Sequence, residues 1–178
     1  MKQRPFSTAS FYFLPRLAAA GLGLGIATWP MLAAAQCMTR LKGTTYTTLP
    51  ENLCPKYTDM LLGRTLKQQE YGGVICDRPE ASYILLQRLV KYTPQGKAVW
   101  QIIQVKPITK PNAQSLILGT GCRLQPQQAS AATSPIFALV QTTAKSTYHT
   151  LSAWQVNLDQ ESFADLEPQQ VICKDTLE

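Results

Sequence analysis

Two apolar runs around a short turn constrain the fold of this chain more than any other feature. Residues 83–92 and 98–105 are rich in aromatic and β-branched side chains, and the turn Thr-Pro-Gln-Gly at 93–96 separates them. Proline fixes φ at the second turn position and glycine tolerates the last, so the pattern predicts a β-hairpin. A helix over 80–92 is the alternative, since the apolar residues there also suit a 3.6-residue period. The second run ends at Pro107 and does not suit a helix, so the hairpin is preferred.

Further short strands are expected along the rest of the chain. The pattern of β-favouring residues and turn signals predicts them at 37–49, 74–76, 115–124, 136–142, 150–158, 162–166 and 171–173. Glycines 119 and 121 predict a bulge or a close backbone approach within one of these strands. Thr58 or Asp59 is predicted to cap a short helix through Leu66, which Gly63 weakens.

These elements predict the fold class. No alternation of strands and helices occurs, which argues against a parallel sheet. We therefore expect a mainly β fold, a small antiparallel sandwich or barrel-like domain with disulfides and one short helix. Trp100 and Trp154 are expected to fill its core.

The first 35 residues have the pattern of a cleavable signal peptide. They contain Lys2, Arg4 and Arg16 but no acid, and residues 17–32 are uncharged and apolar. The small residues at 33–35 form an A-x-A cleavage site, so cleavage is predicted after Ala35. An uncleaved membrane anchor is the main alternative, since residues 17–35 approach the length that spans a bilayer.

Export would leave residues 36–178 as one domain, periplasmic or extracellular, without a transmembrane span. All five cysteines of the chain lie in this part, where an oxidising compartment favours disulfides. Cys122 and Cys173 are predicted to pair, because both lie on strands of one expected sheet. Cys76 is then left to pair with Cys37 or with Cys54, and the expected bonded set is Cys122, Cys173, Cys76 and Cys37. One of the five cysteines is then left without a partner in the chain.

Charge is distributed unevenly along the expected domain. No acid occurs between Glu80 and Asp159, whereas the last 20 residues contain six acids and one lysine. The basic side chains of that middle segment are Arg88, Lys91, Lys97, Lys106, Lys110, Arg123 and Lys145. This middle segment is predicted to attract the acidic tail, or to present cations to an anionic component of the envelope; a solvated surface without a partner is the third interpretation.

Candidate catalytic residues are few. His149 is the single histidine and lies among hydroxyl residues, but no nucleophile motif, metal-ligand spacing or phosphate loop accompanies it. We expect it on an exposed turn between strands. No catalytic, cofactor-binding or metal-binding residue is therefore predicted, and no cofactor.

The function that follows is a non-enzymatic binding or structural module of the cell envelope, with an unknown protein or an anionic envelope component as its partner. Arg88, Lys91, Tyr92, Lys97 and Trp100 mix cations and aromatics as nucleic-acid sites do, but no binding motif accompanies them, so no nucleic acid is expected. The alternative is a small periplasmic hydrolase that uses His149 as its base. A binding module should show an exposed apolar or cationic patch, whereas a hydrolase should show His149 in a pocket with a second polar group.

Overall fold

The computed structural model describes residues 41–65, 67–77, 82–125, 134–142 and 148–174. The predicted signal peptide, Cys37 and Lys145 lie outside the described residues. The described chain is built almost wholly from antiparallel strands, so the expected mainly β class is confirmed.

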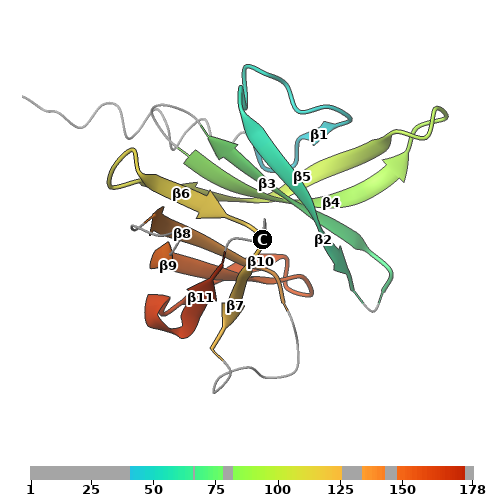
Figure 1. Cartoon of the computed structure of the whole chain (residues 1–178). Helices are drawn as coiled ribbons and strands as arrows, with labels where there is room; N and C mark the ends of the chain where they lie inside the picture. Colours follow the sequence, from blue (N-terminus) through green and yellow to red (C-terminus); the bar gives the residue numbers. More distant parts are fainter. Residues whose placement is uncertain (1–40, 66, 78–81, 126–133, 143–147, 175–178) are drawn as a thin grey trace, which may run out of the picture.

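Two sheets and a small ribbon make up the fold (Figure 1). The first sheet has the order β1 (Thr45–Tyr46), β5 (Ala98–Ile108), β4 (Ser82–Tyr92), β3 (Glu70–Asp77) and β2 (Tyr57–Arg64). The second has the order β10 (Ser162–Leu166), β9 (Tyr148–Asn157), β8 (Ile136–Thr142) and β6 (Ser115–Leu118). β7 (Cys122–Leu124) and β11 (Val171–Cys173) pair as a ribbon, which we call the C-terminal ribbon. A single 3₁₀ turn, η1 (Pro168–Gln170), precedes β11.

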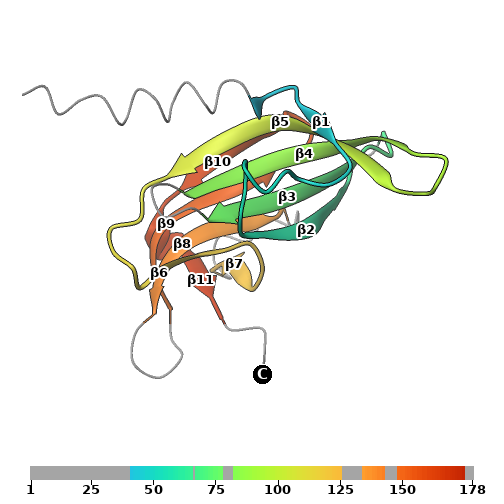
Figure 2. The same ribbon diagram turned by 90° about the horizontal axis from the view of Figure 1, so that it is seen from above.

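The predicted hairpin is confirmed as β4 and β5, which form the longest strand pair of the fold. Pro107 does not end the second strand: it lies opposite Tyr83, and β5 continues to Ile108. The hairpin extends beyond the body of the molecule at its turn, as seen from above in Figure 2.

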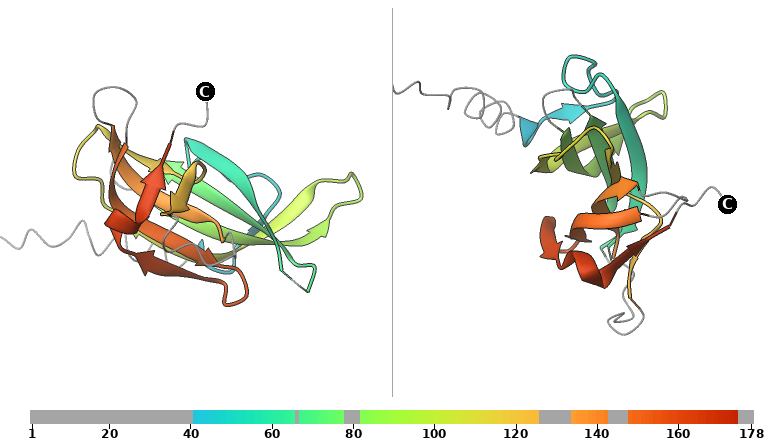
Figure 3. Two further views of the ribbon diagram at one scale, coloured as in Figure 1. Left: turned by 60° about the horizontal axis from the view of Figure 1, so that its bottom comes forward. Right: turned by 60° about the vertical axis from the view of Figure 1, so that its left-hand side comes forward.

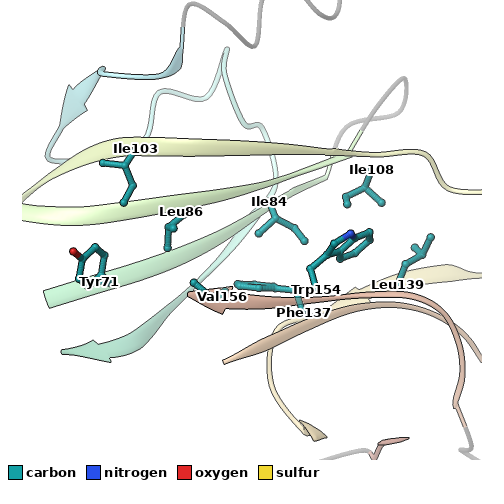
Figure 4. Packing of buried hydrophobic residues seen from close by; sticks show 9 residues of the cluster. All are labelled: Tyr71, Ile84, Leu86, Ile103, Ile108, Phe137, Leu139, Trp154 and Val156. Atoms are coloured by element: carbon teal, nitrogen blue, oxygen red, sulfur yellow. The ribbon is translucent and has the colours of Figure 1, made fainter. Parts of the chain in front are cut away.

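The main core lies between the facing sides of the two sheets (Figure 4). The first sheet supplies Tyr71, Ile84, Leu86, Ile103 and Ile108, and the second supplies Phe137, Leu139, Trp154 and Val156. Burial of such side chains is the dominant stabilising term in a domain of this size. The expectation for Trp154 is confirmed. Trp100, by contrast, is only half-buried and lies outside this core.

Each sheet is also covered on its outer face. Residues 41–56, which we call the N-terminal segment, cross the outer face of the first sheet and bury Leu41, Leu49 and Cys54 against it. The C-terminal ribbon covers the outer face of the second sheet and buries Val171 and Cys173 (Figure 3). The molecule is therefore a sandwich with a thin additional layer on either side.

One disulfide holds each additional layer. Cys54 of the N-terminal segment is bonded to Cys76 of β3, and Cys122 is bonded to Cys173 across the C-terminal ribbon. The second bond is the predicted one. The Cys54–Cys76 bond corrects the expected set of bonded cysteines, in which Cys37 was the partner of Cys76. Cys54 is the partner because its segment lies directly on the face where Cys76 is buried. These disulfides fit an extracellular or periplasmic protein.

Two further expectations are wrong. The segment predicted as a helix through Leu66 is the strand β2, because pairing with β3 satisfies its backbone and places Met60 and Leu62 against the core. The predicted single strand 115–124 is two strands, β6 and β7, which belong to different sheets. The chain changes sheet at residues 119–121, where a Cβ on Gly119 would lie 2.8 Å from the Phe137 ring.

Candidate functional site

His149 lies on β9 opposite Gln141, and not on a turn as expected. Its side chain is exposed and borders a shallow hollow of about 430 Å³ between the start of β9 and the C-terminal ribbon. Thr150 uses its hydroxyl to donate to the Val171 carbonyl at 3.3 Å, which ties these two elements together. The described residues that line the hollow include no carboxylate, and their cysteine, Cys173, is in a disulfide. Base catalysis by a histidine needs a group that orients the ring, and these lining residues offer no acid for that role.

A second hollow, of about 440 Å³, lies between the end of β2 and the turn that joins β9 to β10. Its polar side chains are Arg64, Thr65, Ser134, Gln155, Asn157 and Asp159. Arg64 is paired with Glu70, and Asn157 accepts a hydrogen bond from the backbone N–H of Gln160 at 2.9 Å. Two of these six groups thus serve local structure.

The basic middle segment meets the acidic tail, as one of the three interpretations of the charge pattern expected. Arg88 pairs with Glu161 at 3.1 Å, and Lys106 pairs with Asp165 at 2.8 Å. Lys106 also lies over the Trp154 ring, 5.5 Å from its centroid. Tyr71 donates a hydrogen bond to the same Glu161 carboxylate at 3.1 Å. These contacts join the first sheet to β10 and its preceding turn, so Arg88 and Lys106, two of the seven basic side chains of the middle segment, are paired within the fold.

The outer face of the first sheet, beside and beyond the part that the N-terminal segment covers, is different in character. Aromatic and polar side chains from all five strands belong to this face. We call this surface the tyrosine face. It consists of Tyr46, Tyr57, Asp59, Leu61, Glu70, Gly72, Gln87, Leu89, Tyr92 and Trp100.

Strand register places these side chains on the same side. Residues directly opposite one another in an antiparallel pair point to the same face. Trp100 lies opposite both Tyr46 and Leu89. On β2, Tyr57 lies opposite Cys76, whose side chain is buried under the N-terminal segment and so marks the outer face. Alternation along β2 then puts Asp59 and Leu61 on that face as well.

Tyr46 and Gln87 form the polar centre of the tyrosine face. The Tyr46 hydroxyl donates a hydrogen bond to Gln87 Oε1. Burial raises the pKa of Tyr46 above its ordinary value, and the neighbouring Tyr57 and Asp59 raise it further. The Tyr46 side chain therefore reaches from β1 at the edge of the sheet across β5 to Gln87 of β4.

Gly72 makes room for this centre. A Cβ built on Gly72 would lie 2.7 Å from Gln87 Nε2, closer than side-chain atoms approach one another. Gln87 is only 4% exposed, and its side-chain oxygen accepts the hydrogen bond from Tyr46.

The distal border of the face is an ionic cluster. Glu70 is paired with Arg64 and also accepts a hydrogen bond from the Tyr92 hydroxyl at 3.3 Å. This contact joins the end of the β4–β5 hairpin to the β2–β3 hairpin. The Tyr92 ring is held in place by it while remaining 58% exposed.

Sequence reasoning missed the tyrosine face as a unit. The sequence suggests a nucleic-acid site for Tyr92 and Trp100, or a core position for Trp100, and places Tyr46 in the expected strand 37–49. The available signal is a tyrosine at the end of β1, at the start of β2 and at the end of β4. The helix expected in place of β2 hid the exposed residues Tyr57 and Leu61. The face consists of residues 46 to 100, which only the strand order brings together.

Comparison with known protein families, with curated proteins and with solved structures finds no match. Within the described ranges, no group of three or more ligand side chains is placed to hold a metal ion. The helices of that same part include none long and apolar enough to cross a membrane.

Proposed function

We propose that this chain is an exported, non-enzymatic binding module of the cell envelope that holds its partner on the tyrosine face. One observation carries the proposal. Five large hydrophobic side chains are exposed among the described residues, and three of them, Tyr57, Leu61 and Tyr92, belong to this one face, with Leu61 at 78% exposure. Large apolar side chains exposed on one face of a protein are typical of an interaction site.

The other features agree with a binding role. Tyr46 and Tyr92 are held by hydrogen bonds to Gln87 and Glu70, so these two rings are ordered before a partner arrives. Pre-ordered aromatic groups lose little conformational entropy on binding. Two disulfides fix the layers around the sheet and suit a protein that works outside the cytoplasm.

A direct test uses the protein purified after export from cells that express the full chain. The exported protein is expected to bind isolated envelope material from those cells, and the triple variant Tyr57→Ser, Leu61→Ser, Tyr92→Ser should bind at least about tenfold more weakly. Leu116→Ser is the matched control, because Leu116 is an exposed hydrophobic residue on the second sheet. Equal binding by the triple variant and the wild type would refute the proposal.

The alternative is a small hydrolase that uses His149, favoured by the hollow beside that residue. It would be supported if exported protein hydrolysed ester or amide substrates and His149→Ala abolished the activity. Activity that His149→Ala leaves intact would exclude this histidine as the base.

A further inference from the structure

We propose that the partner of this protein supplies an extended polypeptide segment, which pairs with the free edge of β2 as an additional antiparallel strand. The inference rests on the proposed function and names the chemistry of the partner. The segment carries a basic residue, with an apolar residue two positions before it and another two positions after it. Three features of β2 support this: its unpaired backbone groups, its exposure compared with the other sheet edges, and the side chains along it.

β2 ends the first sheet and has one unpaired long side. The sheet order places β3 on one side of it and no described strand on the other (Figure 2). The backbone N–H of Asp77 donates to the Lys56 carbonyl at 3.0 Å, and these two residues lie opposite one another just before Tyr57. In an antiparallel pair, hydrogen-bonded residues alternate with residues whose backbone groups point away from the partner strand. The backbone N–H and C=O groups of Tyr57, Asp59 and Leu61 therefore point away from β3, and we call these six groups the β2 edge.

The β2 edge is open among the described residues, none of which makes a backbone hydrogen bond to it. The strand is exposed along this stretch, with Tyr57 at 44% and Leu61 at 78% exposure. A row of unpaired backbone donors and acceptors is a template for another extended backbone. The bulge between Leu61 and Gly63 ends the row. The β2 edge therefore offers three residues for hydrogen-bonded pairing with an added strand.

The other sheet edges are shorter or blunted, as the edges of natural proteins usually are. At the opposite border of the first sheet, β1 covers part of β5, and Pro107 further along β5 has no N–H to donate. In the second sheet, β6 has four residues and β10 has five, of which Asp165 is paired with Lys106. β2 has eight residues and no proline, so it is the longest strand at a sheet border in the described chain.

The side chains along the β2 edge select the sequence of the segment. Residues directly opposite one another in an antiparallel pair place their side chains on the same face. Opposite Tyr57 and Leu61, the segment meets exposed apolar side chains, and opposite Asp59 it meets a carboxylate that forms no ion pair with any described residue. Apolar pairs and pairs of opposite charge are favourable across strands. Apolar, basic and apolar residues at alternate positions therefore fit this edge.

A second copy of the chain fits the β2 edge poorly. Two such edges related by a twofold axis overlap fully only when Asp59 of one copy lies opposite Asp59 of the other. Like charges directly opposite one another destabilise a strand pair. Displacing one copy by two residues separates the charges but brings either Pro55 or the bulge into the pairing. Charge complementarity therefore favours a basic segment of a different protein.

The test uses exported protein and a capped, fluorescently labelled peptide, Thr-Val-Thr-Lys-Thr-Val-Thr, whose binding is followed by fluorescence polarisation. The peptide should bind. N-methylation of its two valines should weaken binding by about tenfold, because it removes N–H groups that donate to the β2 edge. N-methylation of the two threonines beside the lysine is the matched control. Those N–H groups point away from β2, so binding should be retained.

Changes on β2 test the side-chain pattern. Leu61→Ser should weaken peptide binding by about tenfold, because the segment then covers less apolar surface. Leu116→Ser should leave binding unchanged, since this exposed leucine lies at the border of the second sheet. Asp59→Lys should weaken binding of the lysine peptide by about fivefold and strengthen binding of a peptide with glutamate in place of the lysine.

Four results would contradict this assignment. Binding that survives N-methylation of the valines would show that the peptide does not pair as a strand and would reject the inference. A dimer in sedimentation that Leu61→Ser dissociates, in place of peptide binding, would make a second copy the occupant. Failure of the peptide to bind, while the triple serine variant still loses envelope binding, would reject strand addition but keep the proposed function. If the triple variant retains envelope binding, the proposed function fails instead.

Discussion

Gly72 and Gly73 show how single residues determine this structure. Both lie in the middle of β3, where glycine ordinarily weakens a strand. Their side-chain positions are occupied by other residues: Gln87 reaches over Gly72 on the outer face, and the Phe137 ring reaches over Gly73 in the core. Each glycine is thus required by a close approach on one face of the same sheet.

Gly73→Ala is expected to lower the free energy of unfolding by about 1–3 kcal/mol, the usual cost of forcing an added methyl into a packed core. Its Cβ would lie 2.6 Å from Phe137 Cζ, and Phe137 is fully buried. Urea unfolding of the exported protein measures the loss. In the background of Phe137→Leu the cost of Gly73→Ala should fall below about 1 kcal/mol, because the clash is gone. An unchanged cost in that background would show that Phe137 is not the obstacle.

His149→Ala is expected to change the free energy of unfolding by no more than about 0.5 kcal/mol, as for most exposed positions. The side chain is exposed on β9, and no hydrogen bond joins it to another described residue. Thermal or urea unfolding gives the value. A loss of 2 kcal/mol or more, on the scale of buried positions, would mean that the histidine has a structural role that this arrangement does not show.

At the scale of elements, each disulfide stabilises one of the two outer layers, which have few backbone hydrogen bonds to the sheets. The strand β1 of the N-terminal segment has two residues, and the C-terminal ribbon has three residues in each strand. Short strands contribute few hydrogen bonds and little buried area. A covalent link in each layer compensates for this by restricting the unfolded chain.

Replacing Cys54 and Cys76 together by Ala is expected to lower the free energy of unfolding by about 3 kcal/mol, and the same change at Cys122 and Cys173 by about 4 kcal/mol. The difference follows from sequence separations of 22 and 51 residues. Denaturant unfolding of the two double variants measures both values.

Hydrogen exchange supplies the control for this experiment. Loss of the first disulfide should speed amide exchange in residues 41–56 and leave the C-terminal ribbon protected, and loss of the second should do the reverse. Equal effects of both variants on both layers would contradict the assignment of one disulfide to each layer.

At the scale of the whole molecule, pairs of opposite charge connect parts that lie far apart in the sequence. Asp165 on β10 is held by Lys106 of β5, and Asp77 at the end of β3 is held by Lys110 beyond β5, at 2.7 Å. Hydrogen bonding and attraction by Lys106 lower the pKa of Asp165. Partial burial works to raise the pKa of Asp77, but hydrogen bonds from Lys110 and Ser82 outweigh it and lower that pKa.

Acidification is therefore expected to destabilise the protein below about pH 4. A carboxyl whose pKa is lower in the folded state contributes stability above its unfolded pKa, and loses it as the pH falls through the folded value. The urea midpoint should fall between pH 4 and pH 2.5, and less so in the double variant Asp77→Asn, Asp165→Asn. Asp77 should dominate, since solvent screens the more exposed Asp165.

Glu51→Gln is the control for the acid experiment, because Glu51 is an exposed acid in the N-terminal segment without an ion pair among the described residues. Its acid dependence should equal that of the wild type. If the double asparagine variant loses as much stability on acidification as the wild type, these two ion pairs are not the origin of the effect.

The sequence was informative wherever the signal was local. The β4–β5 hairpin followed from its turn and its two apolar runs, and the mainly β class followed from the spacing of such runs. The prediction of a helix at 57–64 was wrong because Met60, Leu61 and Leu62 suit a helix and a strand about equally in isolation. Pairing with β3 decided the matter, since it satisfies the backbone and divides those side chains between core and surface.

The chain by itself determined which residues are apolar, where turns occur, and that cysteines and opposite charges were available to pair. Only the tertiary structure decided which of them meet: Cys76 with Cys54, Arg88 with Glu161, and Tyr46 with Gln87 across 41 residues of sequence. The tyrosine face belongs to this second group. Strand order is set by the burial of both faces of each sheet at once, a property of the whole packed molecule that no local window of sequence contains.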